Sequence, residues 1–469
     1  MMTGCRKTPL NGRPTCHRAS YEVARAKADS ATNYWTSTEN SSNNAWNVNF
    51  SSGNTNNNNK YNQNRVRAVA AFGKEFDVFF DTILEAYEDC LRGKRSSRQA
   101  VEYMAIAHED LVALAVEIWT GAYKPSVSTA FIVKYPKYRE VFAAHFRDRI
   151  VHHWICLRLN PLFEERFRSQ GNVSHNCRVG FGTKTAVQSV AEGMASVSDH
   201  YHKPAWVFKG DLVSCFMSID KQILWHRLSI FITRRYHGDY KDILLRLTHI
   251  TVFHRPELNC ILNSDPALWE KMECGKSLFR NDSGKGEPIG NLTTQLFVNF
   301  LLSFLDAYVL YLFRRRNFHY ARFVDDFSIV CDDLAFLKKA IGLIELFLLH
   351  VLSLVLHKDK RYLQPVAHGV LFVGSYIKPG RIYLSNRVVG KFLMKAYGYS
   401  RKADREGLEA YDVRRIQSSL NSYFGFCQGR QTYRIRMRVM TVINILLVRH
   451  FYVMNLRKLC IRKEYKDIK

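Results

Sequence analysis

The sequence predicts an α+β fold in which apolar strands carry isolated acidic residues and longer stretches form helices. Segments 206–210 and 319–330 are short and apolar, and acids follow or interrupt them, as expected of strands that end in turns. Segment 75–118 carries apolar residues at helical spacing. Hydrophobic residues make up 47% of the 469-residue chain, which is enough to form globular cores around these elements.

The most informative feature is the pair Asp325 and Asp326 within the apolar segment 319–330. Two adjacent carboxylates among buried residues are costly unless a cation compensates their charge. An isolated Asp-Asp pair is most often an exposed tight turn. Apolar and aromatic residues flank this pair on both sides, which instead favours a metal site at the tip of a strand-turn-strand hairpin.

A carboxylate metal site needs a third acid, and Asp211 directly follows the apolar strand 206–210. Mg²⁺ prefers oxygen ligands at roughly 2.0–2.1 Å, and three acids can hold two such ions about 3.5–4 Å apart for phosphoryl transfer. Two Mg²⁺ ions, or Mn²⁺ in their place, are therefore the expected cofactor. We expect Asp211 and Asp325 to be direct ligands, while Asp326 either binds metal or shapes the turn.

These residues resemble the reverse transcriptases, in the family's order, from about Lys134 to Tyr433. Segment 323–326 resembles the family's Tyr/Phe-x-Asp-Asp box, and Asp211 resembles its first palm aspartate. Phe216 matches the aromatic steric gate, whose ring fills the space of a ribose 2′-hydroxyl. The resemblance implies a right-hand polymerase fold with fingers, palm and helical thumb. It also implies an RNA-directed DNA polymerase, a nucleotidyltransferase that binds template RNA, dNTPs and the RNA–DNA duplex.

Segment 285–299 resembles the reverse transcriptases of diversity-generating retroelements. Ile289-Gly290 and Thr294-Gln295 stand where most reverse transcriptases carry Gln-Gly and Ser-Pro, although the usual residue of the group at Thr294 is Ser. Gly290 lets the backbone approach the incoming nucleotide, and Ile289 replaces an amide with an apolar branch. We hypothesise that Ile289 loosens base selection. The resemblance implies cDNA synthesis that is error-prone at template adenines and serves mutagenic retrohoming into a variable gene.

The resemblance also implies contacts with nucleotides and template. Lys134 and Arg139 are expected to bind the triphosphate, because both side chains suit phosphate oxygens; the alternative is a solvated surface cation. Arg178 is expected to touch the template backbone. Lys360, with Lys358 as the alternative, is expected near the departing pyrophosphate as a general acid; an exposed basic hairpin has nearly equal weight.

The C-terminal region 386–469 is predicted to be a helical thumb that follows the duplex. The formal charge of the chain is +26, which favours a phosphate backbone and makes its binding salt-sensitive. Arg434 and Arg436 belong to a basic run in this region, and Gly374 ends a box that resembles the primer grip. Three aromatic residues are expected in the thumb core rather than stacked on bases: Tyr423, Phe424 and Tyr433.

The N-terminal leader, residues 1–72, is rich in asparagine, with thirteen between Asn33 and Asn64. It resembles the C-terminal end of the C-type-lectin-like variable proteins that diversity-generating retroelements mutate, and asparagine codons begin with two adenines. The leader therefore looks like a translated template repeat, expected to be partly disordered. The alternative is a generic low-complexity linker. The other predicted boundaries give N-terminal helices and fingers at 73–200, palm at 201–385 and thumb at 386–469.

Two further patterns exclude other classes. Eleven cysteines occur without a Cys-x-x-Cys pair, so neither a zinc site nor a disulfide framework is expected, and a reducing cytoplasm is the natural setting. The resemblance to diversity-generating retroelements implies that this cytoplasm is bacterial and that the gene is bacterial or phage-encoded. The apolar stretch 296–313 carries Asn299 and Asp306, which favours a buried helix over a membrane span.

Two rival functions share part of this pattern. A retron-like or group II intron-like reverse transcriptase would carry the same aspartates, but Ile289 and Gln295 argue against it. A catalytically inactive RNA-binding defence protein would not need the complete acid set or Phe216. The resemblance to diversity-generating enzymes also implies a small, basic, oligomeric accessory protein as a partner.

Overall fold

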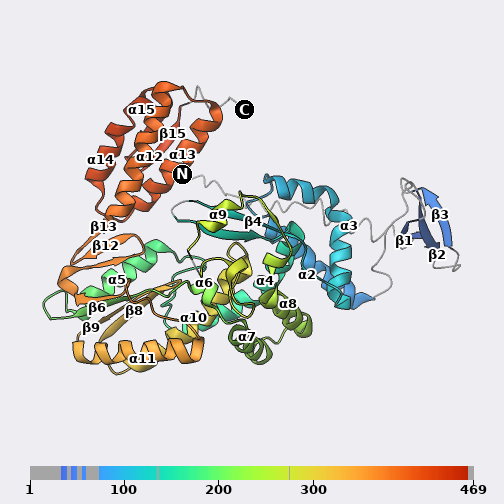
Figure 1. Cartoon of the computed structure of the whole chain (residues 1–469), viewed down its shortest axis with the longest axis horizontal. Helices are drawn as coiled ribbons and strands as arrows, with labels where there is room; N and C mark the ends of the chain where they lie inside the picture. The colour runs from blue at the N-terminus through green and yellow to red at the C-terminus, as the bar shows by residue number, and fades with distance from the viewer. Residues whose placement is uncertain are drawn as a thin grey trace, which may run out of the picture. The chain divides into compact units, whose positions relative to one another are not determined.

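The computed structural model describes residues 73–134, 137–273 and 275–462, and the backbone of three strands before them. The chain divides into two compact units, Met1–Lys124 and Pro125–Lys469 (Figure 1). None of the three predicted domain boundaries falls at this division.

The first unit contains a small sheet and a pair of helices. The sheet is antiparallel, in the order β1 (Asn33–Glu39), β2 (Asn44–Asn49) and β3 (Thr55–Asn59); the rest of the predicted disordered leader lies outside the described residues. Helices α2 (Lys74–Leu91) and α3 (Arg98–Thr120) pack together, and Trp119 contacts the rings of Phe76 and Phe79 at 5.7 and 5.3 Å between centroids. The helical spacing of segment 75–118 thus corresponds to two helices, and the basic segment 92–97 connects them.

A four-stranded antiparallel sheet forms the centre of the second unit, in the order β10-β6-β9-β8. Its strands are β6 (Trp206–Gly210), β8 (Phe318–Phe323), β9 (Asp326–Cys331) and β10 (Tyr362–Pro365). Helix α5 (Thr183–Val197) packs against β8 and β9, and its apolar residues share one core with the sheet. Helices α4 (Phe146–Ser169) and α11 (Leu334–Leu352) pack against α10 (Leu292–Phe313).

Helix α10 is the one helix in the described part of the chain that is long and apolar enough to cross a membrane. Within its most apolar stretch 67% of the residues are buried inside the protein, and Asn299 and Asp306 are among them. The predicted buried helix is confirmed.

A second, three-stranded sheet has the order β5-β4-β7. Strands β4 (Ser128–Val133) and β5 (Arg139–Ala143) form an antiparallel pair, and β7 (Cys260–Leu262) joins β4 in parallel. Strand β7 belongs to segment 254–285, which follows helices α6 (Cys215–Ser218), α7 (Lys221–Arg235) and α8 (Lys241–Phe253) and includes α9 (Ala267–Glu270). The sequence did not predict that this segment would extend the sheet.

The C-terminal region is mostly helical, as predicted. After the antiparallel sheet of β11 (Val370–Phe372), β12 (Ser375–Lys378) and β13 (Arg381–Leu384) come four helices: α12 (Asn386–Arg405), α13 (Ala410–Cys427), α14 (Tyr433–Val442) and α15 (Asn444–Arg449). A hairpin, β14 (Phe451–Met454) and β15 (Lys458–Ile461), was not predicted. Phe424 is buried and Tyr423 stacks on Phe392 at 4.9 Å, as expected of core residues. Tyr433 is 61% exposed, so its core placement was wrong.

Candidate active site

The three predicted aspartates gather at one edge of the central sheet. Strands β8 and β9 form a hairpin in which Phe323 pairs with Asp326, so Val324 and Asp325 make the turn. Strand β6 runs antiparallel to β9 with Gly210 opposite Phe327. Asp211, the next residue, therefore lies at the same edge as the pair. The predicted strand-turn-strand tip is confirmed.

The turn has a strained backbone. Val324 has a φ of 56°, a region that β-branched residues rarely adopt. Two side chains hold it there: Asn176 Oδ1 accepts the Val324 N–H at 2.8 Å, and Arg322 Nη1 donates to the Val324 carbonyl at 3.1 Å. The position of the catalytic candidates therefore depends on residues that the sequence did not single out.

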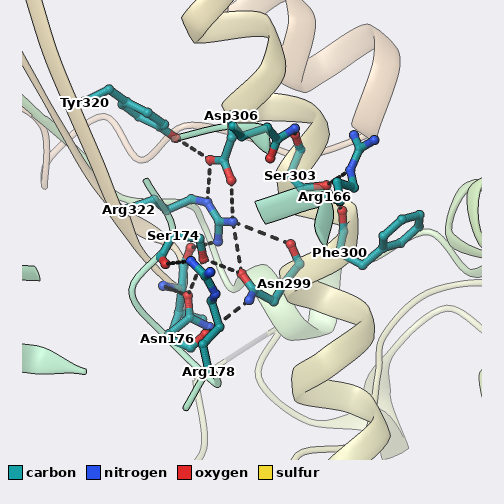
Figure 2. A network of polar contacts seen from close by, with 12 residues as sticks. Arg166, Ser174, Asn176, Arg178, Asn299, Phe300, Ser303, Asp306, Tyr320 and Arg322 are labelled. Carbon is teal, nitrogen blue, oxygen red and sulfur yellow. Dashed lines mark hydrogen bonds and ion pairs between the residues drawn. The ribbon is translucent and has the colours of Figure 1, made fainter. Parts of the chain in front are cut away.

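Arg322 belongs to a buried polar network beneath the hairpin (Figure 2). Its guanidinium forms two bonds of 2.7 Å with Asp306, and both side chains are 0% exposed. Tyr320 donates to the same carboxylate at 2.8 Å, and Arg322 Nη2 donates to Asn299 Oδ1 at 3.0 Å. The sequence offered one signal for this network, namely the polar residues within the apolar helix α10, because buried polar groups require hydrogen-bonding partners.

Arg178, predicted to touch the template backbone, has intramolecular partners in this structure, and a template contact stays a prediction. The Arg178 side chain is 1% exposed and its Nη2 lies 2.9 Å from Glu164 Oε2. It also donates to Asn172 Oδ1 at 2.7 Å and to the Ser174 carbonyl at 2.8 Å. Arg178 therefore fixes the loop that carries Asn176, because its donors face the protein rather than solvent.

Two lysines neutralise the aspartates in this structure. Lys360 Nζ lies 3.0 Å from Asp211 Oδ2, and Lys209 Nζ lies 2.7 Å from Asp326 Oδ1. The backbone brings Lys360 close, because the His357 N–H donates to the Asp211 carbonyl at 2.7 Å. Lys360 was predicted near the departing pyrophosphate, and that role stays a prediction; its ion pair with Asp211 and the ion pair of Lys209 with Asp326 were not predicted.

The remaining carboxylate lies in an unfavourable electrostatic environment. Burial, together with the negative charges of Asp326 and Asp211, raises the pKa of Asp325 to about 6. Burial also raises the pKa of Asp326, opposed by Lys209. Such shifts mark negative charge that lacks a compensating cation.

The aspartates suit a hard divalent cation by their chemistry, since all three offer oxygen ligands in a crowded anionic site. Among the described residues no group of three or more His, Cys, Asp or Glu side chains is already drawn together at ligand distances. Lys360 and Lys209 instead hold Asp211 and Asp326. Asp211, Asp325 and Asp326 are the residues that would bind Mg²⁺, with the lysine ammonium groups standing in for part of its charge.

A cavity of about 590 Å³ opens beside the hairpin turn. Six of the predicted site residues line it: Asp325, Asp326, Arg139, Phe216, Ile289 and Gln295. The Glu287 N–H donates to the Phe216 carbonyl at 2.8 Å, which places segment 285–299 beside the gate residue. Lys134 is exposed and does not line the cavity, so its triphosphate contact stays a prediction.

Gly290 is required by packing against the strand β5. Its φ is 128°, and a Cβ there would lie 2.7 Å from the Phe142 carbonyl oxygen. The Phe142 N–H donates to the Ile289 carbonyl at 2.9 Å. The close neighbour of Gly290 is therefore strand β5, and its predicted approach to the incoming nucleotide stays a prediction. Gln295 accepts a weak bond from the Cys177 thiol at 3.3 Å.

Lys276, from the unpredicted segment 254–285, supplies a further cation to the cavity. Burial lowers the pKa of Lys276, and the charges of Lys137 and Lys360 lower it further. Glu140 anchors this segment, because its carboxylate accepts bonds from Trp269 Nε1 at 2.7 Å and from the Leu278 N–H at 2.7 Å. Lys276 and Arg139 thus line one cavity with the acidic turn.

The C-terminal helices carry a separate basic groove of about 750 Å³ between α12 and α13. Lys391, Lys395 and Arg415 line it beside three serines. Gly374 has a φ of 75° and turns β11 into β12. Arg434 is exposed on α14, whereas Arg436 donates to the Leu456 carbonyl at 3.1 Å. Nucleic-acid contacts of these residues stay predictions.

Comparisons with known proteins give structural similarity at low sequence identity. No family model and no curated protein matches the chain. Similar solved structures include apo telomerase from Candida tropicalis, with 11% identity, a TM-score of 0.43 and coverage of 69% of this chain and 61% of that one. Telomerase from Candida albicans, in complex with a fragment of telomeric RNA, has 12% identity, a TM-score of 0.40 and coverage of 69% and 59%. The chain spans less than two thirds of the length of these telomerase chains.

Proposed function

We propose that this protein is an RNA-directed DNA polymerase. The observation that carries the proposal is the gathering of three carboxylates at a hairpin tip, where two of them line a cavity that also contains Arg139, Lys276 and Phe216. Acids on one side and cations on another suit a triphosphate substrate, because the transfer of a phosphoryl group needs positioning and compensation of charge more than covalent help.

Each residue of the site has a separate role in the proposed reaction. Asp211 and Asp325 would hold the divalent ions, which when bound activate the primer hydroxyl and neutralise the triphosphate. Arg139 and Lys276 bind phosphate oxygens from the cavity wall. Lys360, beside Asp211, lies where it can give a proton to the departing pyrophosphate. The ring of Phe216 excludes a ribose 2′-hydroxyl and so selects dNTPs.

The test is primer extension on an RNA template with Mg²⁺. Asp325→Ala is expected to lose synthesis by several orders of magnitude while it keeps its affinity for the template-primer, because the variant removes a metal ligand and no nucleic-acid contact. A wild-type protein without any extension activity would favour the inactive RNA-binding alternative. Equal extension by variant and wild type would overturn the assignment of Asp325.

We further propose that the polymerase belongs to a diversity-generating retroelement and misincorporates at template adenines. Ile289 supports this, because it lines the cavity next to Phe216 and presents an apolar branch where an amide would recognise a base edge. On this proposal the leader is a translated template repeat, the product enters a variable gene, and a small basic accessory protein assists.

The Ile289→Gln substitution tests the proposed base selection. Restoring an amide is expected to lower errors opposite template adenines by several-fold, with little change opposite other bases, because the amide adds a hydrogen-bonding group to the pocket. Sequencing of cDNA made in vitro on one template measures both. Ile289→Leu is the matched control, and an error spectrum that Ile289→Gln leaves unchanged would refute the proposal.

A further inference from the structure

A second cavity, of about 470 Å³, lies between helices α4, α7 and α10, and we call it the arginine cavity. It shares no lining residue with the cavity beside the Val324–Asp325 turn, which is called the catalytic cavity below. Four arginines and two phenylalanine rings dominate its wall: Arg166, Arg227, Arg234, Arg235, Phe231 and Phe304. The polymerase chemistry uses none of these residues, so their concentration needs another explanation.

Two of the guanidinium groups share one ring. The central carbons of Arg166 and Arg227 lie 4.4 and 4.7 Å from the centroid of Phe304. Arg166 Nε also donates to Ser303 Oγ at 2.6 Å, which fixes the orientation of its guanidinium. Burial lowers the pKa of Arg166 and the charge of Arg227 lowers it further, against the opposing effect of Asp306. Like charges held this close favour a bound anion.

The described part of the chain supplies little negative charge to this cavity. Arg235 pairs with Glu165 at 2.8 Å, and both side chains are more than half exposed. Asp306 is already bound by Arg322. Among the described residues no carboxylate lies within ion-pair distance of Arg166, Arg227 or Arg234. The cavity therefore has at least three guanidinium groups available to an anionic ligand.

The chemistry of the wall favours a nucleotide unit. Guanidinium forks match phosphate oxygens in bidentate geometry, and phosphate contacts of this kind do not depend on the base that a nucleotide carries. The volume is within the range of about 300–1,000 Å³ that small-ligand sites occupy. We propose that this cavity binds the phosphodiester backbone of single-stranded RNA at a site separate from the catalytic cavity.

The two cavities are linked by helix α10. Gln295 lines the catalytic cavity and Phe304 lines the arginine cavity, nine residues further along the helix. This separation is about 14 Å along the helix axis. RNA held here would be anchored near the catalytic cavity without occupying it, which goes beyond the proposed polymerase reaction and does not depend on it.

The test compares two double charge reversals for binding of a short fluorescent single-stranded RNA of random sequence, without divalent metal or dNTPs. Arg227→Glu with Arg234→Glu alters the cavity. Arg314→Glu with Arg315→Glu makes the same charge change at exposed residues outside it. The cavity variant is expected to bind the RNA at least about tenfold more weakly than the control variant. The slope of its log affinity against log salt concentration is expected to be smaller in magnitude than that of the wild type by about 1.4, because two phosphate contacts are lost.

Equal weakening by both variants would overturn the site, because net charge alone would then explain the loss. Weaker binding of a polyglutamate peptide with unchanged RNA binding would overturn it in favour of an acidic protein partner. If ATP binds the wild-type protein as tightly as the RNA does, the proposed RNA site is overturned in favour of a site for a free nucleotide. None of these outcomes involves DNA synthesis, so a failure of the polymerase proposal is distinguishable.

A measurement on the wild-type chain protects against a folding defect in the variants. RNA that contains 4-thiouridine is crosslinked by light, and the modified peptides are identified by mass spectrometry. Crosslinks to peptides that contain Phe231 or Phe304 are expected. Crosslinks confined to the catalytic cavity and the C-terminal helices would overturn the proposal.

Discussion

At the residue scale, the turn of Val324 and Asp325 has two separate costs. Val324 has a positive φ, and Asp325 has a raised pKa beside two other acids. Neither feature stabilises the fold, and strain of this kind is tolerated where the surroundings hold it in place. Asn176 and Arg322 hold the backbone, which leaves the charge to be compensated by a ligand.

The charge of Asp325 predicts a pH-dependent gain in stability for Asp325→Asn. The folded-state pKa, about 6, is above the ordinary 3.8, so ionisation above about pH 6 costs the folded state free energy that protonation removes as the pH falls. Without divalent metal, Asp325→Asn is expected to raise the free energy of unfolding by about 1–2 kcal/mol at about pH 7.5, after discounting for partial exposure.

Urea unfolding in the presence of EDTA measures this gain. At about pH 4.5 the folded side chain is mostly protonated while the unfolded one, with the ordinary pKa of 3.8, is still mostly ionised, so the difference between variant and wild type is expected to fall to about a third of its value at pH 7.5. A gain of the same size at both pH values would show that the charge of Asp325 is not its cause.

At the element scale, the hairpin of β8 and β9 is held from below by the buried pair of Arg322 and Asp306. Arg322→Met is expected to lower the free energy of unfolding by about 3–5 kcal/mol, because it leaves a buried carboxylate without its cation. Adding Asp306→Leu is expected to recover part of this loss, since the pair is then replaced by apolar groups.

Arg316→Met is the matched control, because Arg316 makes a 3.0 Å ion pair with Asp333 at the exposed surface. Its expected cost is below about 1 kcal/mol. Urea unfolding measures all three variants. A cost for Arg322→Met as small as that of the control would show that the network does not hold the hairpin.

At the scale of the whole molecule, the candidate catalytic residues all lie in the unit Pro125–Lys469. Helices α2 and α3 of the other unit begin after Gly73 and have aromatic contacts of their own. A chain that starts at Gly73 is therefore expected to keep primer-extension activity close to that of the full chain when an intact RNA template is supplied.

Primer extension by the two chains, at matched concentrations and on one template-primer, measures the effect. A chain that starts at Pro125 is the companion variant, because it also removes α2 and α3 and so separates their contribution from that of the leader. Loss of activity on removal of residues 1–72 alone would contradict the view that the leader acts as RNA rather than as protein.

The local features of this protein could be predicted from its amino-acid sequence alone. The acids at strand ends, the helical spacing before β4, and the buried nature of α10 were predictable, because each depends on neighbours in the chain. The aspartate turn was predictable because charge within an apolar strand is costly wherever the strand lies.

Which side chains meet depends on the tertiary fold. Arg178 pairs with Glu164, Lys209 neutralises Asp326, and Lys276 reaches the cavity from a segment without a recognisable pattern. The arginine cavity likewise combines three helices that are far apart in the chain. Such contacts depend on packing between segments that are distant in the chain. The residue spacing that predicts a helix or a strand does not predict which distant side chains they contact.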